Sequence, residues 1–176
     1  LEENIAVTKL VVRAAHTMGI GVEAELGFVG MGTDYADPDF VRQGFTKPEE
    51  AARFVEETGV DALAIAFGSG HGVYQGEPEL ALDLVADIRD RIDVPLVLHG
   101  GSGLSEEQFR GSIEMGISKV NIFTDLGINA SKKMVLAAQE DLPNAALYFK
   151  IGGAAQSAFT ERCKYFLDLF GATGKA

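Results

Sequence analysis

Apolar and polar positions follow two different periods along the chain, and their succession predicts strands alternating with helices. A helix is predicted over residues 2–18, where apolar side chains recur at helical spacing and two glycines follow. Short strands are predicted over residues 22–26, 61–67, 94–98 and 117–122. Further helices are predicted from Pro48, over residues 78–92, from Ser105 and from Thr124, and a helical tail is predicted over about residues 146–170.

The second and third predicted strands are apolar on both faces. Such strands, alternating with helices, indicate a parallel sheet covered by helices. A doubly wound sheet and a (β/α)8 barrel both fit this pattern, but no G-x-G-x-x-G follows a strand, which disfavours the dinucleotide-binding fold. The pattern therefore favours an α/β fold of the TIM-barrel type, with four strand–helix units in this chain.

Local signals predict where several elements begin and end. The stretch over residues 27–44 is rich in Gly and Asp and is predicted to be a long loop. Thr46 is a candidate cap for the helix that follows, and Gly59 ends that helix. Ser105 and Gln108 form a capping box. Gly152 and its neighbouring glycine are expected to interrupt or delay the tail helix.

Composition and charge limit the classes of function. The 176 residues are 47% hydrophobic and carry a formal charge of −11, which indicates a folded domain and argues against nucleic acid or an anionic membrane as the main partner. The one cysteine, Cys163, excludes an intrachain disulfide and is expected to be an ordinary apolar residue on a helix. No run has the length of a membrane span. We expect a cytoplasmic protein, and the start without Met suggests that the chain begins inside a longer one.

Two of the three histidines follow the ends of neighbouring buried strands. His71 comes after the second predicted strand and His99 after the third, while Glu25 lies near the end of the first. Neighbouring parallel strands are about 4.8 Å apart, so these side chains can reach one point above the sheet. Two imidazoles and a carboxylate are a reasonable set of zinc ligands. A structural role for each histidine is the alternative.

Other polar residues leave two interpretations open. His16 lies on the first helix and is expected to be a packed or capping histidine. Glu23 shares a strand face with Glu25, so both carboxylates either lie near the metal or belong to a salt-bridged pair.

Glycine-rich loops follow the third and fourth strands. Gly100, Gly101 and Ser102 lead into a capped helix, whose N-terminus and free backbone N–H groups favour an anion. Asn121 and Thr124 end the next strand and begin the next helix. Phosphate binding at this end is recurrent in barrels, whereas tight turns and a plain helix cap are the structural alternatives.

These motifs resemble those of the class II, metal-dependent fructose-bisphosphate and tagatose-bisphosphate aldolases. The resemblance covers nearly the whole chain and is carried by four segments in register: VEAELG (22–27), GSGHGVY (68–74), PLVLHGGSG (95–103) and KVNIFTD (119–125).

The resemblance implies a (β/α)8 TIM barrel, of which this chain holds about the last four βα units. It also implies a protein that splits a ketose 1,6-bisphosphate into dihydroxyacetone phosphate and an aldehyde such as glyceraldehyde 3-phosphate. It implies that His71 and His99 are two of three zinc-binding histidines and that Glu25 serves a second or alternative metal position. The positions that it matches to substrate phosphate and a monovalent cation (Na⁺ or K⁺) are Gly72, Gly100, Gly101, Ser102, Asn121 and Thr124. The partners implied are a phosphorylated sugar and further copies of the chain, in a dimer or tetramer.

Three departures from the family pattern are visible. The chain lacks the segment that carries the third histidine and, in many members, an aspartate that donates a proton, so the catalytic acid is expected outside it. Residues 27–44 lack the Glu-Glu-Asp run of one branch, and Gln75 stands where a lysine is common. An alternative interpretation is a stand-alone half barrel with a structural or regulatory role. The sequence does not identify which residues distinguish fructose from tagatose bisphosphate.

Overall fold

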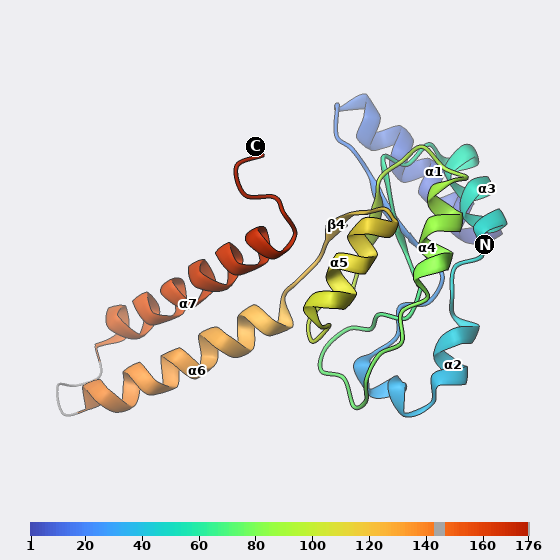
Figure 1. Ribbon diagram of the computed structural model, residues 1–176. Helices are drawn as coiled ribbons and strands as arrows, with labels where there is room; N and C mark the ends of the chain where they lie inside the picture. The colour runs from blue at the N-terminus through green and yellow to red at the C-terminus, as the bar shows by residue number, and fades with distance from the viewer. Residues whose placement is uncertain (143–146, 176) are drawn as a thin grey trace. The chain divides into compact units, whose positions relative to one another are not determined.

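The computed structural model describes residues 1–142 and 147–175. It divides into two compact units, Leu1–Asn121 and Ile122–Ala176, which are described separately below (Figure 1).

The first unit is built on a parallel sheet whose spatial order, β1-β2-β3-β4, is the order of the strands along the chain. The strands are β1 (Glu23–Leu26), β2 (Ala62–Ile65), β3 (Leu96–Leu98) and β4 (Ile117–Val120). Glu23 lies opposite Ala62 and Leu63 opposite Leu96, and every neighbouring pair is parallel. Each connection therefore joins adjacent strands, as in a barrel wall, which confirms the predicted α/β fold with four strand units.

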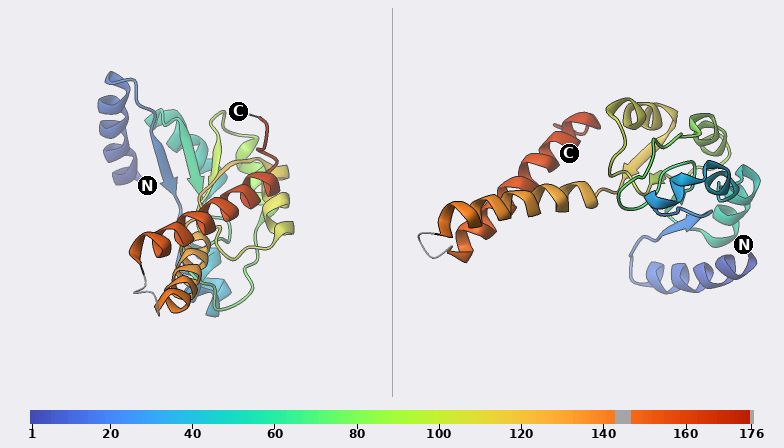
Figure 2. Two further views of the ribbon diagram at one scale, coloured as in Figure 1. Left: turned by 90° about the vertical axis from the view of Figure 1, so that its left-hand side faces the viewer. Right: turned by 90° about the horizontal axis from the view of Figure 1, so that it is seen from below.

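Helices cover the outside of this sheet. They are α1 (Glu2–Thr17), α3 (Pro48–Thr58), α4 (Leu82–Arg89) and α5 (Glu106–Met115). They follow one another round a curved sheet, as the right-hand view of Figure 2 shows, and α3 contacts both α1 and α4. The helices and strands enclose a core of fully buried side chains that includes Phe54, Leu63, Val85, Ile88 and Leu96. Every residue of β2 and β3 is apolar, so the polar side chains of the sheet lie on β1 and β4.

The two outer strands of the sheet, β1 and β4, carry charged side chains. Glu23 and Glu25 are exposed on β1, on the same side of the strand, and Lys119 is exposed on β4. A strand places every second residue on one face, so the two carboxylates share it as predicted.

Two predictions for the segment between β1 and β2 are wrong. Residues 27–44 contain a short 3-10 helix, η1 (Gly32–Ala36), and a helix, α2 (Pro38–Gln43), because the Asp37 carboxylate accepts a hydrogen bond from the Phe40 N–H and caps α2. Thr46 does not cap α3. Its hydroxyl instead donates to the Leu26 carbonyl (2.6 Å) and accepts from the Ala66 N–H (2.8 Å), tying the ends of β1 and β2 together.

Other boundaries agree more closely with the sequence. Gly59 ends α3 in the left-handed conformation, at φ +69°. The capping box of Ser105 and Gln108 is present at the start of α5. The helix predicted over residues 78–92 is shorter, since α4 begins only at Leu82.

The second unit is a pair of packed helices, α6 (Thr124–Asp141) and α7 (Tyr148–Leu169). Arg162 on α7 pairs with Asp125 on α6 at 2.7 Å. The predicted interruption at Gly152 is wrong: a glycine costs about 1 kcal/mol in a helix, which is too little to break 22 residues packed on a neighbour. The predicted start of the tail, near residue 146, lies outside the described residues.

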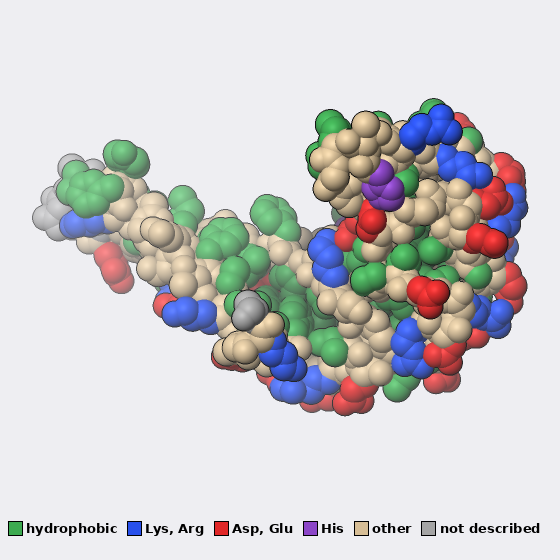
Figure 3. Space-filling model, turned by 90° about the horizontal axis from the view of Figure 1, so that it is seen from above, with side chains coloured by type: hydrophobic (Ala, Val, Ile, Leu, Met, Phe, Trp, Pro, Cys, Tyr) green, Lys and Arg blue, Asp and Glu red, His purple; other side chains and the backbone are tan. Residues whose placement is uncertain are grey.

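The surfaces of the two units differ in character. Charged side chains of both signs intermingle on the first unit in the view of Figure 3, whereas apolar side chains line part of the helical pair. The exposed apolar residues of this pair include Val135, Leu136, Tyr148 and Phe149. In the part of the chain that the structure describes, no helix combines the length and the hydropathy needed to cross a membrane.

Candidate functional site

Three side chains with metal-binding atoms converge at the carboxyl ends of the first three strands. Glu25 lies on β1, His71 lies in the loop after β2, and His99 directly follows β3. Their ligand atoms all lie within 4.8 Å of one another, and the two imidazole rings are 6.1 Å apart. The structure thus brings together the three predicted metal-site residues, and two imidazoles with a carboxylate suit zinc.

His99 is held between two carboxylates. Its Nδ1 lies 2.6 Å from Glu25 Oε2 and its Nε2 lies 3.0 Å from Glu23 Oε1. The hydrogen bond with Glu25 raises the pKa of His99 and Glu23 raises it further, although partial burial opposes both. An ionised carboxylate can only accept, so both hydrogen bonds form when the ring carries a proton on each nitrogen. A metal ligand needs a free lone pair, so an ion could bind this ring only after the ring loses one of these protons.

Glu23 connects three strands through its carboxylate. Oε1 contacts His99 on the β3 side, and Oε2 lies 2.7 Å from the Lys119 ammonium group on β4. Partial burial alone would raise the pKa of Glu23, but hydrogen bonds from Lys119 and His99 outweigh it and lower that pKa. Both carboxylates lie within hydrogen-bonding distance of His99, and Glu25 also belongs to the candidate metal cluster. Both interpretations of this strand, carboxylates near a metal and carboxylates in a salt bridge, therefore fit the structure. The sequence assigned no role to Lys119, although its position on the same face as Asn121 was a usable signal.

The backbone around His71 is fixed by a short stretch of chain before η1. The His71 N–H donates to Gly30 O at 2.8 Å, and the His71 carbonyl accepts from the Gly32 N–H at 2.7 Å. Met31 forms an isolated parallel bridge with His71. The loop after β2 is thereby held as an extension of the sheet, while the imidazole itself is exposed.

The predicted phosphate-binding residues lie mostly at the same end of the sheet. Gly100, Gly101 and Ser102 connect β3 to α5, and Gly72 follows His71. Gly100 has φ +73°, and a Cβ there would lie 2.4 Å from the Gly70 carbonyl oxygen. This position therefore requires glycine, because the two loops touch through their backbones.

The last two predicted phosphate-binding residues lie on opposite sides of the boundary between the units. The Asn121 N–H donates to Leu98 O at 2.9 Å, which ties the ends of β3 and β4. Thr124 is the first residue of α6, in the second unit, and Phe123 occupies the N-cap position there. The plain helix cap considered for Thr124 is therefore wrong, while its role toward phosphate stays a prediction.

Two residues that the sequence left outside the site are found elsewhere. His16, in the last turn of α1, is exposed, so the prediction of a packed histidine is wrong; its Nε2 lies 2.8 Å from Asp61 Oδ2. The hydrogen bonds from His16 and from the Val22 N–H lower the pKa of Asp61. Cys163 lies on α7 as expected, but it is exposed and not packed.

Tyr74 links the two loops that carry the histidines. Its hydroxyl accepts from the Gly70 N–H at 2.8 Å and donates to the Gly100 carbonyl at 2.7 Å. Burial raises the pKa of Tyr74 to about 12, so the phenol stays protonated and able to donate at neutral pH. The sequence alone gave no reason to choose Tyr74 over Gln75.

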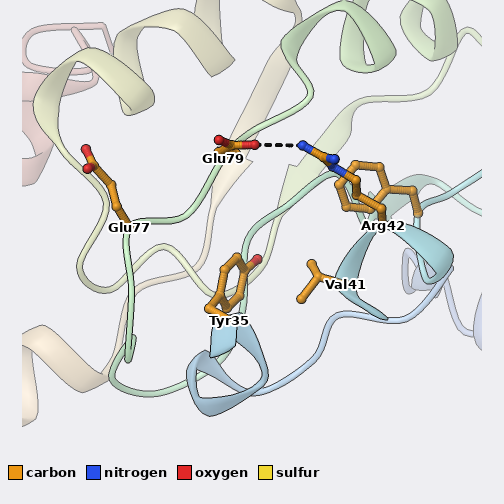
Figure 4. A pocket seen from close by; sticks show the side chains of 6 residues that line it. Tyr35, Val41, Arg42, Glu77 and Glu79 are labelled. Carbon is orange, nitrogen blue, oxygen red and sulfur yellow. Dashed lines mark hydrogen bonds and ion pairs between the residues drawn. The ribbon is translucent and has the colours of Figure 1, made fainter. Parts of the chain in front are cut away.

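A small hollow lies beside α2 (Figure 4). It is lined by Tyr35, Val41, Arg42, Phe45, Glu77 and Glu79. The Arg42 guanidinium pairs with the Glu79 carboxylate at 2.7 Å, as Figure 4 shows, and so connects α2 to the segment before α4. None of the three metal-site residues lines this hollow, so the hollow is not part of the candidate metal site.

Comparison with known proteins identifies the family of this chain. The family model of class-II fructose-bisphosphate aldolases matches residues 1–175. The chain is 42% identical over 175 residues to the uncharacterized protein YdjI of Escherichia coli and 41% identical over 177 residues to a fructose-bisphosphate aldolase of Geobacillus stearothermophilus, and it covers 99% of itself and 60% of the relative in each case.

Comparison with solved structures points to the same family. The crystal structure of the YdjI aldolase from Escherichia coli superposes with a TM-score of 0.81 at 39% identity, over 99% of this chain and 58% of that one. A putative fructose-1,6-bisphosphate aldolase from Coccidioides immitis superposes with a TM-score of 0.79 at 32% identity, over 99% and 60%. The chain thus spans about 60% of the length of these relatives. By its motifs, its sheet and these matches, the chain belongs to the class-II fructose-bisphosphate aldolase family.

Proposed function

We propose that this chain is part of a zinc-dependent aldolase that cleaves a ketose 1,6-bisphosphate to dihydroxyacetone phosphate and an aldehyde such as glyceraldehyde 3-phosphate, or condenses the two. The observation that carries the proposal is the convergence of Glu25, His71 and His99 in a member of an aldolase family. His71 and His99 would hold zinc, and Glu25 would serve a second or alternative metal position. Zinc, when bound, would act as a Lewis acid for the charge that develops as the C3–C4 bond breaks.

The loops at this end of the sheet would bind and orient the substrate phosphate. Gly100, Gly101 and Ser102 precede the N-terminus of α5, where backbone N–H groups favour an anion. Asn121 is tied to the same loop system by its bond to Leu98. Held there, the phosphate would fix the reacting carbons relative to His71 and His99, which lowers the entropic cost of reaction. We propose that Na⁺ or K⁺ supports this phosphate subsite.

A complete site would need groups beyond those described. A catalytic zinc ion takes three protein ligands and keeps one open position for water or substrate. We propose that the third histidine and the proton donor are supplied by chain outside these 176 residues, in keeping with the 60% coverage of the relatives.

The experiment is cleavage of fructose 1,6-bisphosphate and, separately, tagatose 1,6-bisphosphate by the natural polypeptide, with zinc and after removal of zinc by a chelator. We expect His99→Ala to abolish both zinc binding and cleavage. His16→Ala is the matched control, because His16 is also paired with a carboxylate but lies on α1. Full activity in chelator, or in His99→Ala, would contradict the proposal.

We also propose that the protein works as a homo-oligomer, a dimer or tetramer, in the cytoplasm. The exposed apolar side chains on α6 and α7 support an association surface. Light scattering on the natural polypeptide measures the mass directly, and a monomer at micromolar concentration would contradict this part of the proposal.

A further inference from the structure

One phenol joins the backbones beside both candidate zinc ligands. The Tyr74 hydroxyl accepts a hydrogen bond from the N–H of Gly70, the residue before His71. It donates to the carbonyl of Gly100, the residue after His99. A single oxygen atom therefore bridges two loops that leave different strands, within one residue of each ligand.

The two loops approach each other closely beside Tyr74. A Cβ on Gly100 would meet the Gly70 oxygen at 2.4 Å, and a Cβ on Gly103 would meet the Tyr74 ring at 3.0 Å. The Tyr74 ring thus lies against the loop of His99, and the Tyr74 hydroxyl is bonded to the same loop through Gly100. In close-packed surroundings of this kind, a displacement of one loop is transmitted to its neighbour.

A second tyrosine holds the Tyr74 ring in place. The Tyr35 ring, on η1, packs edge-on against it with the ring centres 4.9 Å apart and the planes at 78°. The Tyr35 hydroxyl in turn donates to the Gly68 carbonyl, at the beginning of the loop that carries His71. Tyr35 therefore supports one loop, whereas Tyr74 joins both.

We propose that Tyr74 is a positioning residue that sets the separation of His71 and His99 and so organises the metal site before zinc arrives. It acts through the backbone and does not itself touch the metal. The proposal rests on the proposed function, because it takes zinc to bind at these two histidines. Groups that orient metal ligands change metal affinity by about 10–100-fold when they are removed.

The test is Tyr74→Phe in the natural polypeptide, with zinc alone as the probe and a chelating dye as competitor. The substitution keeps the ring and removes only the bridging oxygen. We expect the zinc Kd to rise by about tenfold or more. Tyr35→Phe is the matched control. It removes a neighbouring phenol oxygen that bonds to the Gly68 carbonyl and does not join the two loops, so its zinc Kd should stay close to the wild-type value.

A spectroscopic readout separates positioning from general stability. Co²⁺ in place of zinc reports the ligand geometry through its visible absorption bands. We expect these bands to shift in Tyr74→Phe and to keep their wild-type positions in Tyr35→Phe. A merely structural role would lower the melting temperature of both variants and leave the bands unchanged.

Three results would overturn the inference: a wild-type Kd and cobalt spectrum in Tyr74→Phe, an equal loss of affinity in Tyr35→Phe, or a zinc-free Tyr74→Phe protein that is unfolded at the assay temperature. The last would show that the phenol serves the whole fold and not the site. Failure of the wild-type protein to bind zinc would instead overturn the proposed function, so the two failures are distinguishable.

Discussion

Replacing Gly100 by alanine tests whether the two histidine loops touch through their backbones. Gly100 has φ +73°, and its new Cβ would lie 2.4 Å from the Gly70 carbonyl oxygen. An ordinary contact begins at 3.4 Å, so the loops would have to separate by about 1 Å. We expect Gly100→Ala to destabilise the protein and to weaken zinc binding, because the movement displaces His99 relative to His71.

The expected magnitude has two parts, and the chain offers a control for one of them. A left-handed backbone costs an L-residue roughly 1–2 kcal/mol, and displacement of the facing backbone should bring the total to roughly 2–4 kcal/mol. Gly59 has nearly the same backbone angle, φ +69°, but nothing lies within 4 Å of its Cβ position. Gly59→Ala should therefore show the first part alone.

The assay is urea unfolding followed by far-ultraviolet circular dichroism, with the slope m compared among the variants. We expect the free energy of unfolding to fall further in Gly100→Ala than in Gly59→Ala, at unchanged m. If Gly100→Ala costs no more than Gly59→Ala, the close contact between the loops does not exist in solution, and the argument for a fixed separation of the histidines fails with it.

Three further predictions concern charge and hydrogen bonding. Because the pKa of His99 is raised, its ion pairs should stabilise the zinc-free protein fully at pH values below 6.5 and lose this contribution as the pH rises through the raised pKa, whereas zinc affinity should increase over the same range. Urea unfolding and zinc titration at a series of pH values measure the two trends; stability and zinc affinity that both rise, or both fall, with pH would contradict the assignment. Lys119→Met should raise the pKa of Glu23, because the ammonium group that lowers it is gone; carboxyl NMR titration measures the shift, and an unchanged value would show that the pair is not formed. Thr46→Val should lower the free energy of unfolding by roughly 2–3 kcal/mol in urea unfolding, because two buried backbone groups lose their hydrogen-bond partner. Thr17→Val is the control, since the exposed Thr17 hydroxyl bonds to Arg13 O; a smaller cost for Thr46→Val than for Thr17→Val would refute the bridging role.

The sheet and three residues of the candidate site could be predicted from the sequence because their signals are local. Continuous apolar runs mark buried parallel strands. His99 directly follows one such run and His71 follows another after a short glycine-rich stretch, so both are expected at the carboxyl end of the sheet. Two such histidines in successive units must then be neighbours. The capping box at Ser105 and the glycine at the end of α3 are equally local, and both are present.

What the sequence could not predict depends on contacts between distant segments. Threonine is a common residue type at helix N-caps, but the ends of β1 and β2 offer the Thr46 hydroxyl two buried hydrogen-bond partners that no local pattern reveals. The short helices within residues 27–44 are set by Asp37 and by backbone bonds to the loop of His71. Tyr74 is three residues beyond His71 and has no periodic signal, so only the folded chain shows that it reaches Gly100.

The most direct test of the central claim is the zinc content and zinc affinity of the natural polypeptide, measured after dialysis for the wild type, His71→Ala, His99→Ala and the control His16→Ala. The account predicts one tightly bound zinc ion in the wild type and in His16→Ala, and loss of that ion in each of the other two variants. Zinc retained with wild-type affinity in both His71→Ala and His99→Ala would contradict it.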